Sequence, residues 1–299
     1  MSNPGIAVAD AIHSTGIHLT MRAGFIGLGH IGADMAQALV APPFELTVFD
    51  VVPAALKRFE AIARLAGCAA EVGRHSEIVG VCVRDDAQLR AVLTGSEGLL
   101  EGMGKGGIVL VHSTVRATTI RELARVAAER GVDLIDAAVS RTVQGAATRF
   151  VCSMVGGDPS IMERARPVLE AFSTAIVHAG PLGAGMVIKA CNNLTTFIQF
   201  IAAHESFRLA EANGIDPIVL RRVMTENGNL TPSMAAFMNF RTPATARPDP
   251  PELAALRTRM GRLSEKDLEV ALELARDSGL TLPATERARS LILGVFENK

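Results

Sequence analysis

Short apolar runs alternate with helical patterns through the first 180 residues of the chain. The runs that predict strands lie at residues 22–28, 45–50, 77–83, 107–113, 134–139 and 150–155. A helix is predicted at residues 31–40, where Pro42 and Pro43 end it, and Pro53 opens the next helix because proline is accepted at a first helical position. Strands that alternate with helices predict an α/β domain with a mostly parallel, doubly wound sheet.

Residues 183–214 are predicted to form one helix of about thirty residues, roughly 45 Å long at 1.5 Å per residue. Its N-terminal half is apolar on nearly every side, so we expect it to be buried. Lys189 is its one charge before His204, and Asn193 projects from the same face one turn later. A buried amine is costly unless it has a partner or a function. Only helical patterns follow, apart from a proline-rich loop at residues 242–251.

Three parts are therefore expected: a flexible N-terminal extension (1–21), a nucleotide-binding domain (22–182) and an all-helical domain (183–299), with the long helix between the two domains. The first twenty residues lack the basic start and the apolar run of a signal peptide. The four cysteines have no metal-type spacing and lie in apolar contexts, which indicates buried thiols in a reducing cytoplasm.

Composition narrows the function further. The chain is 48% hydrophobic and 20% charged, which supplies a core and argues against global disorder. A net charge of −1 without a basic stripe argues against nucleic acid as a partner. Lys189, Asn192, Asn193 and Gln199 interrupt the most apolar stretch, so a membrane span is not expected. The histidines show no ligand spacing, and no metal is predicted.

A glycine fingerprint follows the first predicted strand. It reads Gly27-Leu28-Gly29-His30-Ile31-Gly32, and Asp50 ends the second strand. The first glycine permits a tight turn, the second lets a pyrophosphate approach the backbone, and the third lets helix and strand pack closely. Phosphate would then lie on the N–H groups that open the helix. Asp50 would accept from both adenosine ribose hydroxyls and repel a 2′-phosphate, which favours NAD over NADP. The alternative is a structural turn beside a surface aspartate.

Three further motifs carry a family resemblance. They are Asp136-Ala137-Ala138-Val139-Ser140, the glycine-rich entry at 180–185 that leads to Lys189 and Asn192-Asn193, and Glu265-Lys266-Asp267-Leu268. With the fingerprint, they resemble the β-hydroxyacid dehydrogenase family from about Arg22 to the C-terminus. The resemblance implies a Rossmann-type domain, a long inter-domain helix and an all-α C-terminal domain. It also implies hydride transfer between a nicotinamide cofactor and a small 3-hydroxy acid or its aldehyde acid.

The resemblance also implies residue roles. Lys189 would be the catalytic acid/base, Asn193 would position the substrate and Ser140 would bind its carboxylate. Lys266 would close over cofactor and substrate, and Ser113 and Thr114 would lie near the nicotinamide. The chemistry agrees for Lys189, because burial lowers a lysine pKa towards the working pH. The alternatives are a lysine that reaches solvent, a serine that caps a turn at Ser140, a solvated Lys266 and a helix cap at Ser113.

The chain departs from the family pattern after Ser140, where two glycines are usual and Arg141-Thr142 stand here. The added charge suggests that Arg141 binds a second anionic group of the substrate, such as another carboxylate or a phosphate. The alternative is that Arg141 points outward or pairs with a local acid. His112 stands where many relatives have an acid, and the sequence offers no reason for it.

Three other functions compete with this interpretation. A 6-phosphogluconate dehydrogenase-like enzyme is disfavoured by Asp50 and by the chain length, and imine reductases lack the lysine found at position 189. A dinucleotide-binding protein without catalysis is the non-enzyme alternative, and the altered loop at Arg141 is its only support. Since the long helix is too apolar for one small domain to cover, a homodimer or homotetramer is expected.

Overall fold

The computed structural model describes residues 20–142, 148–240 and 250–299. Most of the predicted N-terminal extension and most of the predicted loop at 242–251 lie outside these residues. Two units can be distinguished within the chain. One comprises the described residues up to 112 together with 123–134 and 163–172, and the other comprises 113–122, 135–162 and 173–299. The domain boundaries expected from the sequence stay a prediction.

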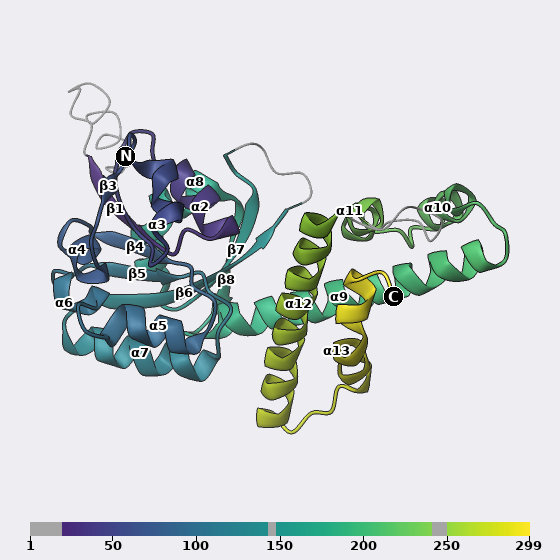
Figure 1. Ribbon diagram of the computed structural model, residues 1–299. Coiled ribbons are helices and arrows are strands. Elements are labelled where there is room, and N and C mark those ends of the chain that lie inside the picture. Colours follow the sequence, from purple (N-terminus) through teal and green to yellow (C-terminus); the bar gives the residue numbers. More distant parts are fainter. Residues whose placement is uncertain (1–19, 143–147, 241–249) are drawn as a thin grey trace, which may run out of the picture. The chain divides into compact units, whose positions relative to one another are not determined.

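An eight-stranded sheet forms the centre of the nucleotide-binding part (Figure 1). Its strands are β1 (Met21–Ile26), β2 (Phe44–Phe49), β3 (Arg64–Leu65), β4 (Ile78–Val81), β5 (Ile108–Val111), β6 (Asp133–Arg141), β7 (Val151–Gly156) and β8 (Ser173–Gly180). They are hydrogen-bonded in the order β3-β2-β1-β4-β5-β6-β7-β8. β6 and β7 pair antiparallel, whereas β1 pairs in parallel with β2 and β4. The predicted parallel-dominated Rossmann-type sheet is thereby confirmed.

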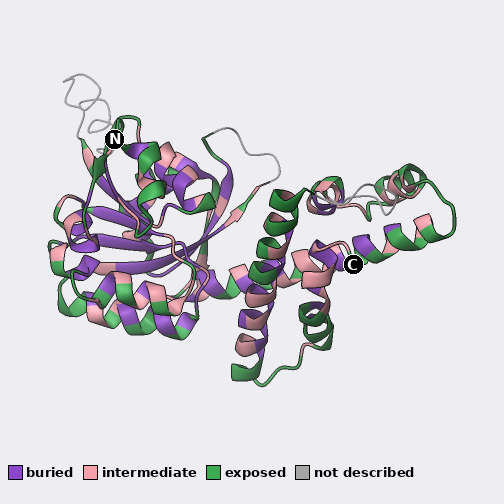
Figure 2. Cartoon of the chain, viewed as in Figure 1, coloured by how far each residue is buried: buried purple, intermediate pink, exposed green. Residues whose placement is uncertain are grey.

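Helices connect these strands. They are α2 (His30–Ala38), α3 (Pro53–Leu56), the 3-10 turn η1 (Lys57–Phe59), α4 (Ala69–Arg74), α5 (Asp86–Thr94), α6 (Leu99–Gly102), α7 (Ala117–Glu129) and α8 (Pro159–Phe172). α2 and α5 lie on opposite faces of the sheet (Figure 1). The central strands are buried on both faces (Figure 2), and Phe25, Val79 and Leu110 have no exposed surface. Such strands appear in the sequence as continuous apolar runs, which is why they were predictable.

His112 belongs to this core. Its ring stacks on Phe25 at 5.8 Å between centroids and meets the edge of Phe172 at 5.5 Å. It is 3% exposed. The histidine therefore serves as a flat aromatic side chain in the core, which explains a residue that the sequence left without a role.

The C-terminal part is all-helical, as predicted. It consists of α9 (Ala184–Ala212), α10 (Pro217–Glu226), α11 (Pro232–Phe240), α12 (Pro251–Asp277) and α13 (Pro283–Phe296). Its core gathers Phe207, Phe237, Leu268 and Ile292, and Phe200 stacks on Phe237 at 4.3 Å. Across the described ranges, no helix has both the length and the apolarity that crossing a bilayer requires.

The single helix expected at 183–214 is confirmed as α9, but the expectation that its N-terminal half is buried all round is wrong for one chain. Met186 and Ala190 are buried, whereas Val187 and Ile188 are 39% and 43% exposed. Helices α10, α11, α12 and α13 and strands β7 and β8 pack against α9, yet Val187 and Ile188 remain exposed. The described residues of the same chain do not cover these exposed apolar side chains of α9.

Candidate functional site

Asp136 fixes the start of α9. It has no exposed surface, and its two carboxylate oxygens accept the backbone N–H groups of Gly183 at 2.7 Å and Met186 at 3.0 Å. Burial raises the pKa of the Asp136 carboxyl, and the N–H donors oppose that rise. A Cβ at Gly185 would come within 2.7 Å of Asp136 Oδ2, so the helix approaches the strand closely only with glycine there. The helix that carries Lys189 is thus anchored to β6.

Lys189 points back to the same strand. Its Nζ donates to Ser140 Oγ at 2.9 Å, and Asn192 Nδ2 donates to the same oxygen at 3.2 Å. Burial is the main cause that lowers the pKa of Lys189. The charge of Lys266 lowers it as well, and the carboxylate of Asp267 opposes both. Lys189 and Ser140, which the sequence singled out separately, are therefore in direct contact.

Asn193 lies on the buried side of α9 and faces α12. It is 5% exposed, and its Nδ2 donates to Asp267 Oδ2 at 2.8 Å. The other oxygen of Asp267 lies 3.2 Å from Lys266 Nζ. Asn193 and Lys266, which the sequence singled out separately, are therefore joined through a carboxylate that it did not single out.

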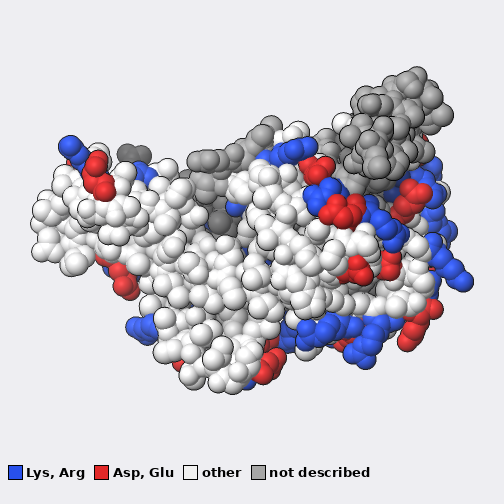
Figure 3. Space-filling view, turned by 180° about the vertical axis from the view of Figure 1, so that it is seen from behind, with Lys and Arg blue, Asp and Glu red and all other residues white. Residues whose placement is uncertain are grey.

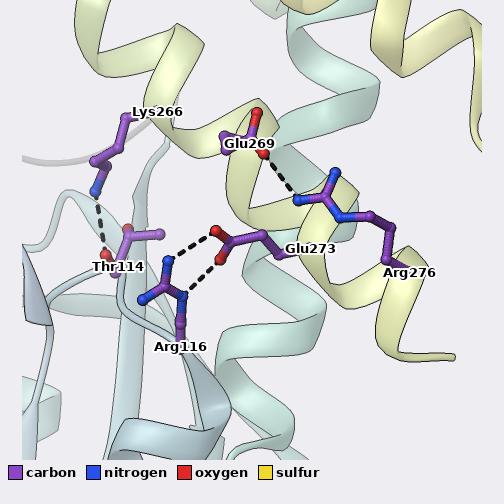
Figure 4. A network of polar contacts seen from close by, with 6 residues as sticks. All are labelled: Thr114, Arg116, Lys266, Glu269, Glu273 and Arg276. Atoms are coloured by element: carbon purple, nitrogen blue, oxygen red, sulfur yellow. Dashed lines mark hydrogen bonds and ion pairs between the residues drawn. The ribbon is translucent and has the colours of Figure 1, made fainter.

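The segment Ser113–Thr114 contacts the same helix. Lys266 Nζ donates to the backbone oxygen of Thr114 at 3.1 Å (Figure 4), and Ser113 is 2% exposed. The alternative that Ser113 caps the next helix is wrong, because α7 begins at Ala117. Ser113, Thr114, Ser140, Lys189, Asn193 and Lys266 all belong to one unit of the chain.

Arg141 and Ser140 project from opposite faces of β6, because successive side chains alternate along a strand. The Arg141 guanidinium lies 4.9 Å from the centre of the Phe150 ring, and the residue is exposed. Thr142 donates its backbone N–H to Phe150 O at 2.8 Å, so this donor is engaged within the chain. The described contacts of Arg141 correspond to the outward-pointing alternative.

The glycine fingerprint forms the turn between β1 and α2, in the other unit. Gly27 has φ 92°, and a Cβ there would collide with the backbone oxygen of Cys82. Gly29 precedes α2 and has nothing within 4 Å of an added Cβ. With no side chain capping it, α2 offers its first N–H groups to an anion, as a dinucleotide-binding turn requires.

Asp50 closes the same turn. Its Oδ2 accepts the N–H of Leu28 at 2.6 Å, and its Oδ1 accepts the N–H of Val52 at 2.8 Å. The carboxylate is half-buried. A negative charge is therefore held in place beside the fingerprint, as an interaction with ribose hydroxyls requires.

Three residues of these clusters were missed from the sequence. Asp136 and Asp267 stood inside recognised motifs but had no assigned role, and Asn192 stood beside Asn193. One available signal was spacing, since Asn192 follows Lys189 by three residues and so lies near it on a helix. No local pattern could pair Asn193 with Asp267, which lies 74 residues further along the chain.

Two family models match the chain. The NAD binding domain of 6-phosphogluconate dehydrogenase matches residues 22–180, and the NAD-binding domain of NADP-dependent 3-hydroxyisobutyrate dehydrogenase matches residues 183–297. An uncharacterised oxidoreductase of Mycobacterium tuberculosis is 37% identical over 270 residues, which cover 90% of this chain and 91% of that protein. The NAD-dependent L-serine dehydrogenase of Pseudomonas aeruginosa is 34% identical over 268 residues, 89% of each protein.

The fold also matches solved structures. The structure of Mycobacterium tuberculosis 3-hydroxyisobutyrate dehydrogenase with L-serine aligns with a TM-score of 0.77 and 28% identity. The alignment covers 92% of this chain and 94% of that chain.

The two glycines give a matched test of the dinucleotide site. We expect Gly29→Ala to keep the melting temperature of the protein and to weaken NADH binding, because the new methyl group occupies open space where a pyrophosphate would approach. Gly27→Ala should lower the free energy of unfolding by about 1–2 kcal/mol or more, because its conformation disfavours a side chain. Thermal unfolding and NADH titration measure both effects. Unchanged NADH affinity in Gly29→Ala would place the dinucleotide elsewhere.

Proposed function

The chain belongs to the β-hydroxyacid dehydrogenase family, and we propose that it interconverts a small 3-hydroxy acid and its aldehyde or keto acid with Lys189 as the acid/base. The observation that carries this proposal is the half-buried amine of Lys189, 2.9 Å from Ser140 Oγ, with its pKa lowered by burial. A lowered pKa lets one amine accept and return a proton.

The nicotinamide supplies or accepts the hydride when NAD(H) is bound. Residues that would hold NAD(H) are Gly27, Leu28, Gly29, His30, Ile31, Gly32 and Asp50 on the adenosine side, and Ser113, Thr114 and Lys266 near the nicotinamide. The remaining task of the protein is to position the substrate and to move one proton.

Ser140 is suited to bind the substrate carboxylate. Its Oγ accepts hydrogen bonds from Lys189 and Asn192, which leaves the hydroxyl proton to donate to an anion. In oxidation, neutral Lys189 takes the proton of the substrate hydroxyl. In reduction, its ammonium polarises the carbonyl and returns that proton. Asn193 holds this face of α9 against Asp267 of α12 and, in this proposal, orients the substrate beside the amine.

Replacement of Lys189 tests the proposal. We expect Lys189→Ala to lower kcat by about 10²–10⁴-fold, the usual contribution of a positioned proton donor, while NADH affinity stays unchanged. Lys189→Arg should be equally inactive, because arginine keeps the charge but does not release its proton. The assay follows NADH consumption over aldehyde and keto acids, and NAD reduction with L-serine and 3-hydroxyisobutyrate.

Two results would contradict it. If Lys189→Ala keeps more than a tenth of wild-type turnover, another group moves the proton. If the wild-type protein binds NADH but never oxidises it, the non-catalytic alternative is correct. Release of carbon dioxide during turnover would instead support the 6-phosphogluconate dehydrogenase-like alternative.

We also propose that NAD is preferred over NADP. Asp50 is held by two backbone N–H groups beside the fingerprint, and its charge would repel a 2′-phosphate. We expect wild-type kcat/KM to be at least about tenfold higher with NAD, which corresponds to about 1.4 kcal/mol. Asp50→Asn removes the charge at nearly constant shape and should narrow that ratio. A wild-type preference for NADP would contradict the assignment.

The hypothesis that Arg141 binds a second anionic group has its own test. Loss of a hydrogen bond to a charged group, about 1.5–3 kcal/mol, would raise KM about tenfold or more. If the hypothesis holds, Arg141→Gly raises KM for dicarboxylate hydroxy acids and leaves KM for monocarboxylates unchanged. Equal changes for both substrate classes would refute it and agree with the contact between Arg141 and Phe150.

The assembly is proposed to be a homodimer or homotetramer. Around the end of α9 and along α10, Leu209, Ile218, Val219 and Val223 are 67%, 73%, 55% and 51% exposed. The surface of this region is mostly uncharged in Figure 3. Apolar surfaces of this kind mark interaction sites. Sedimentation equilibrium should give two or four chains, and Ile218→Asp should lower that number, whereas a monomeric wild-type protein would contradict the proposal.

A further inference from the structure

The segment between β5 and α7 is tied to α12 at two points. Lys266 Nζ donates to Thr114 O at 3.1 Å. Arg116 forms a two-pronged contact with Glu273, with Nε to Oε2 at 2.6 Å and Nη2 to Oε1 at 2.7 Å. Figure 4 shows both contacts reaching from the segment to the same helix.

The spacing of these residues makes the two contacts act on one short piece of backbone. Lys266 and Glu273 are seven residues apart, so they lie two turns apart on one face of α12. Thr114 and Arg116 flank Val115, which has no exposed surface. The segment is therefore held by a buried side chain in the middle and by α12 on both sides.

The Arg116 contact also has the geometry that fixes orientation. A guanidinium that meets a carboxylate through two parallel N–H groups sets the plane of the contact as well as its distance. Arg116 is 55% exposed and Glu273 is 26% exposed at the side chain. Exposed pairs contribute little to overall stability, so an effect of this pair should appear in local geometry rather than in the unfolding temperature.

We propose that Arg116 and Glu273 are a positioning pair for the cofactor. They hold the 113–116 segment in register with α12, so that Ser113, Thr114 and Lys266 are presented together to the nicotinamide end of NAD(H). In this proposal neither residue touches the reacting atoms. Their effect on the cofactor is indirect and passes through Thr114 and Lys266. This inference rests on the proposed function, which places those three residues at the nicotinamide.

The chain offers a matched control on the same helix. Arg276 Nη2 donates to Glu269 Oε1 at 2.9 Å, and both residues lie in α12 (Figure 4). The pair resembles the first one in chemistry and exposure, but the contact joins α12 to itself rather than to the 113–116 segment. Arg276→Ala should therefore leave NADH affinity unchanged.

The experiment measures the Kd for NADH through its fluorescence, which the chain permits because it contains neither Trp nor Tyr. We expect Arg116→Ala and Glu273→Gln each to raise that Kd about three- to tenfold, as for loss of a partly exposed bidentate pair. The melting temperature should stay unchanged. The swapped variant, Arg116→Glu with Glu273→Arg, should recover at least half of the lost affinity on a logarithmic scale, because the interaction belongs to the pair.

Salt provides a second readout. The gap in Kd between the wild-type protein and Arg116→Ala should shrink as ionic strength rises, since a partly exposed pair is screened. The inference is overturned if Arg116→Ala binds NADH like wild type, if Arg276→Ala weakens binding equally, or if the swapped variant recovers nothing. These outcomes can be distinguished from failure of the proposed function, which would appear as turnover retained in Lys189→Ala.

Discussion

The contact between the buried carboxylate of Asp136 and the first N–H groups of α9 is the constraint on which the candidate site depends. Asp136 and Ser140 lie four residues apart on β6 and therefore face the same side of the sheet. Asp136 accepts a hydrogen bond from the backbone at the start of α9, and Ser140 accepts one from Lys189 of the same helix. β6 and α9 are thus joined at two points, and the second point, between Ser140 and Lys189, contains the proposed acid/base.

The charge balance around Lys189 follows from this arrangement. Burial and the positive charge of Lys266 disfavour the ammonium, while the carboxylate of Asp267 favours it. The Asp267 carboxylate also accepts a hydrogen bond from Asn193 of α9, so it connects the helix that carries Lys189 with the helix that carries Lys266. A lysine in such a balance has a pKa that each neighbour adjusts, whereas a solvated lysine stays charged throughout the physiological range.

The parts of this account that the sequence predicted are those with a local signature. The glycine turn, the buried strands and the long helix each follow from residue spacing within a few turns. β8 was missed because only one of its eight residues is buried and its apolar run is limited to Ala175, Ile176 and Val177. The partner of Asn193 was missed because it is brought close only by folding, 74 residues away. The sequence shows that Arg141 adds a positive charge but not which way its side chain points. The alternation of side chains along β6 supplies that direction.

The most direct test of the account is a titration of the Lys189 amine itself, followed by NMR in protein with labelled lysine, with Lys189→Arg used to assign the signal. The account predicts that the pKa of Lys189 lies below the ordinary lysine value because its amine is buried, and that Asp267→Asn lowers this pKa further, because that carboxylate favours the ammonium. A Lys189 pKa equal to that of an exposed lysine, unmoved by Asp267→Asn, would contradict it.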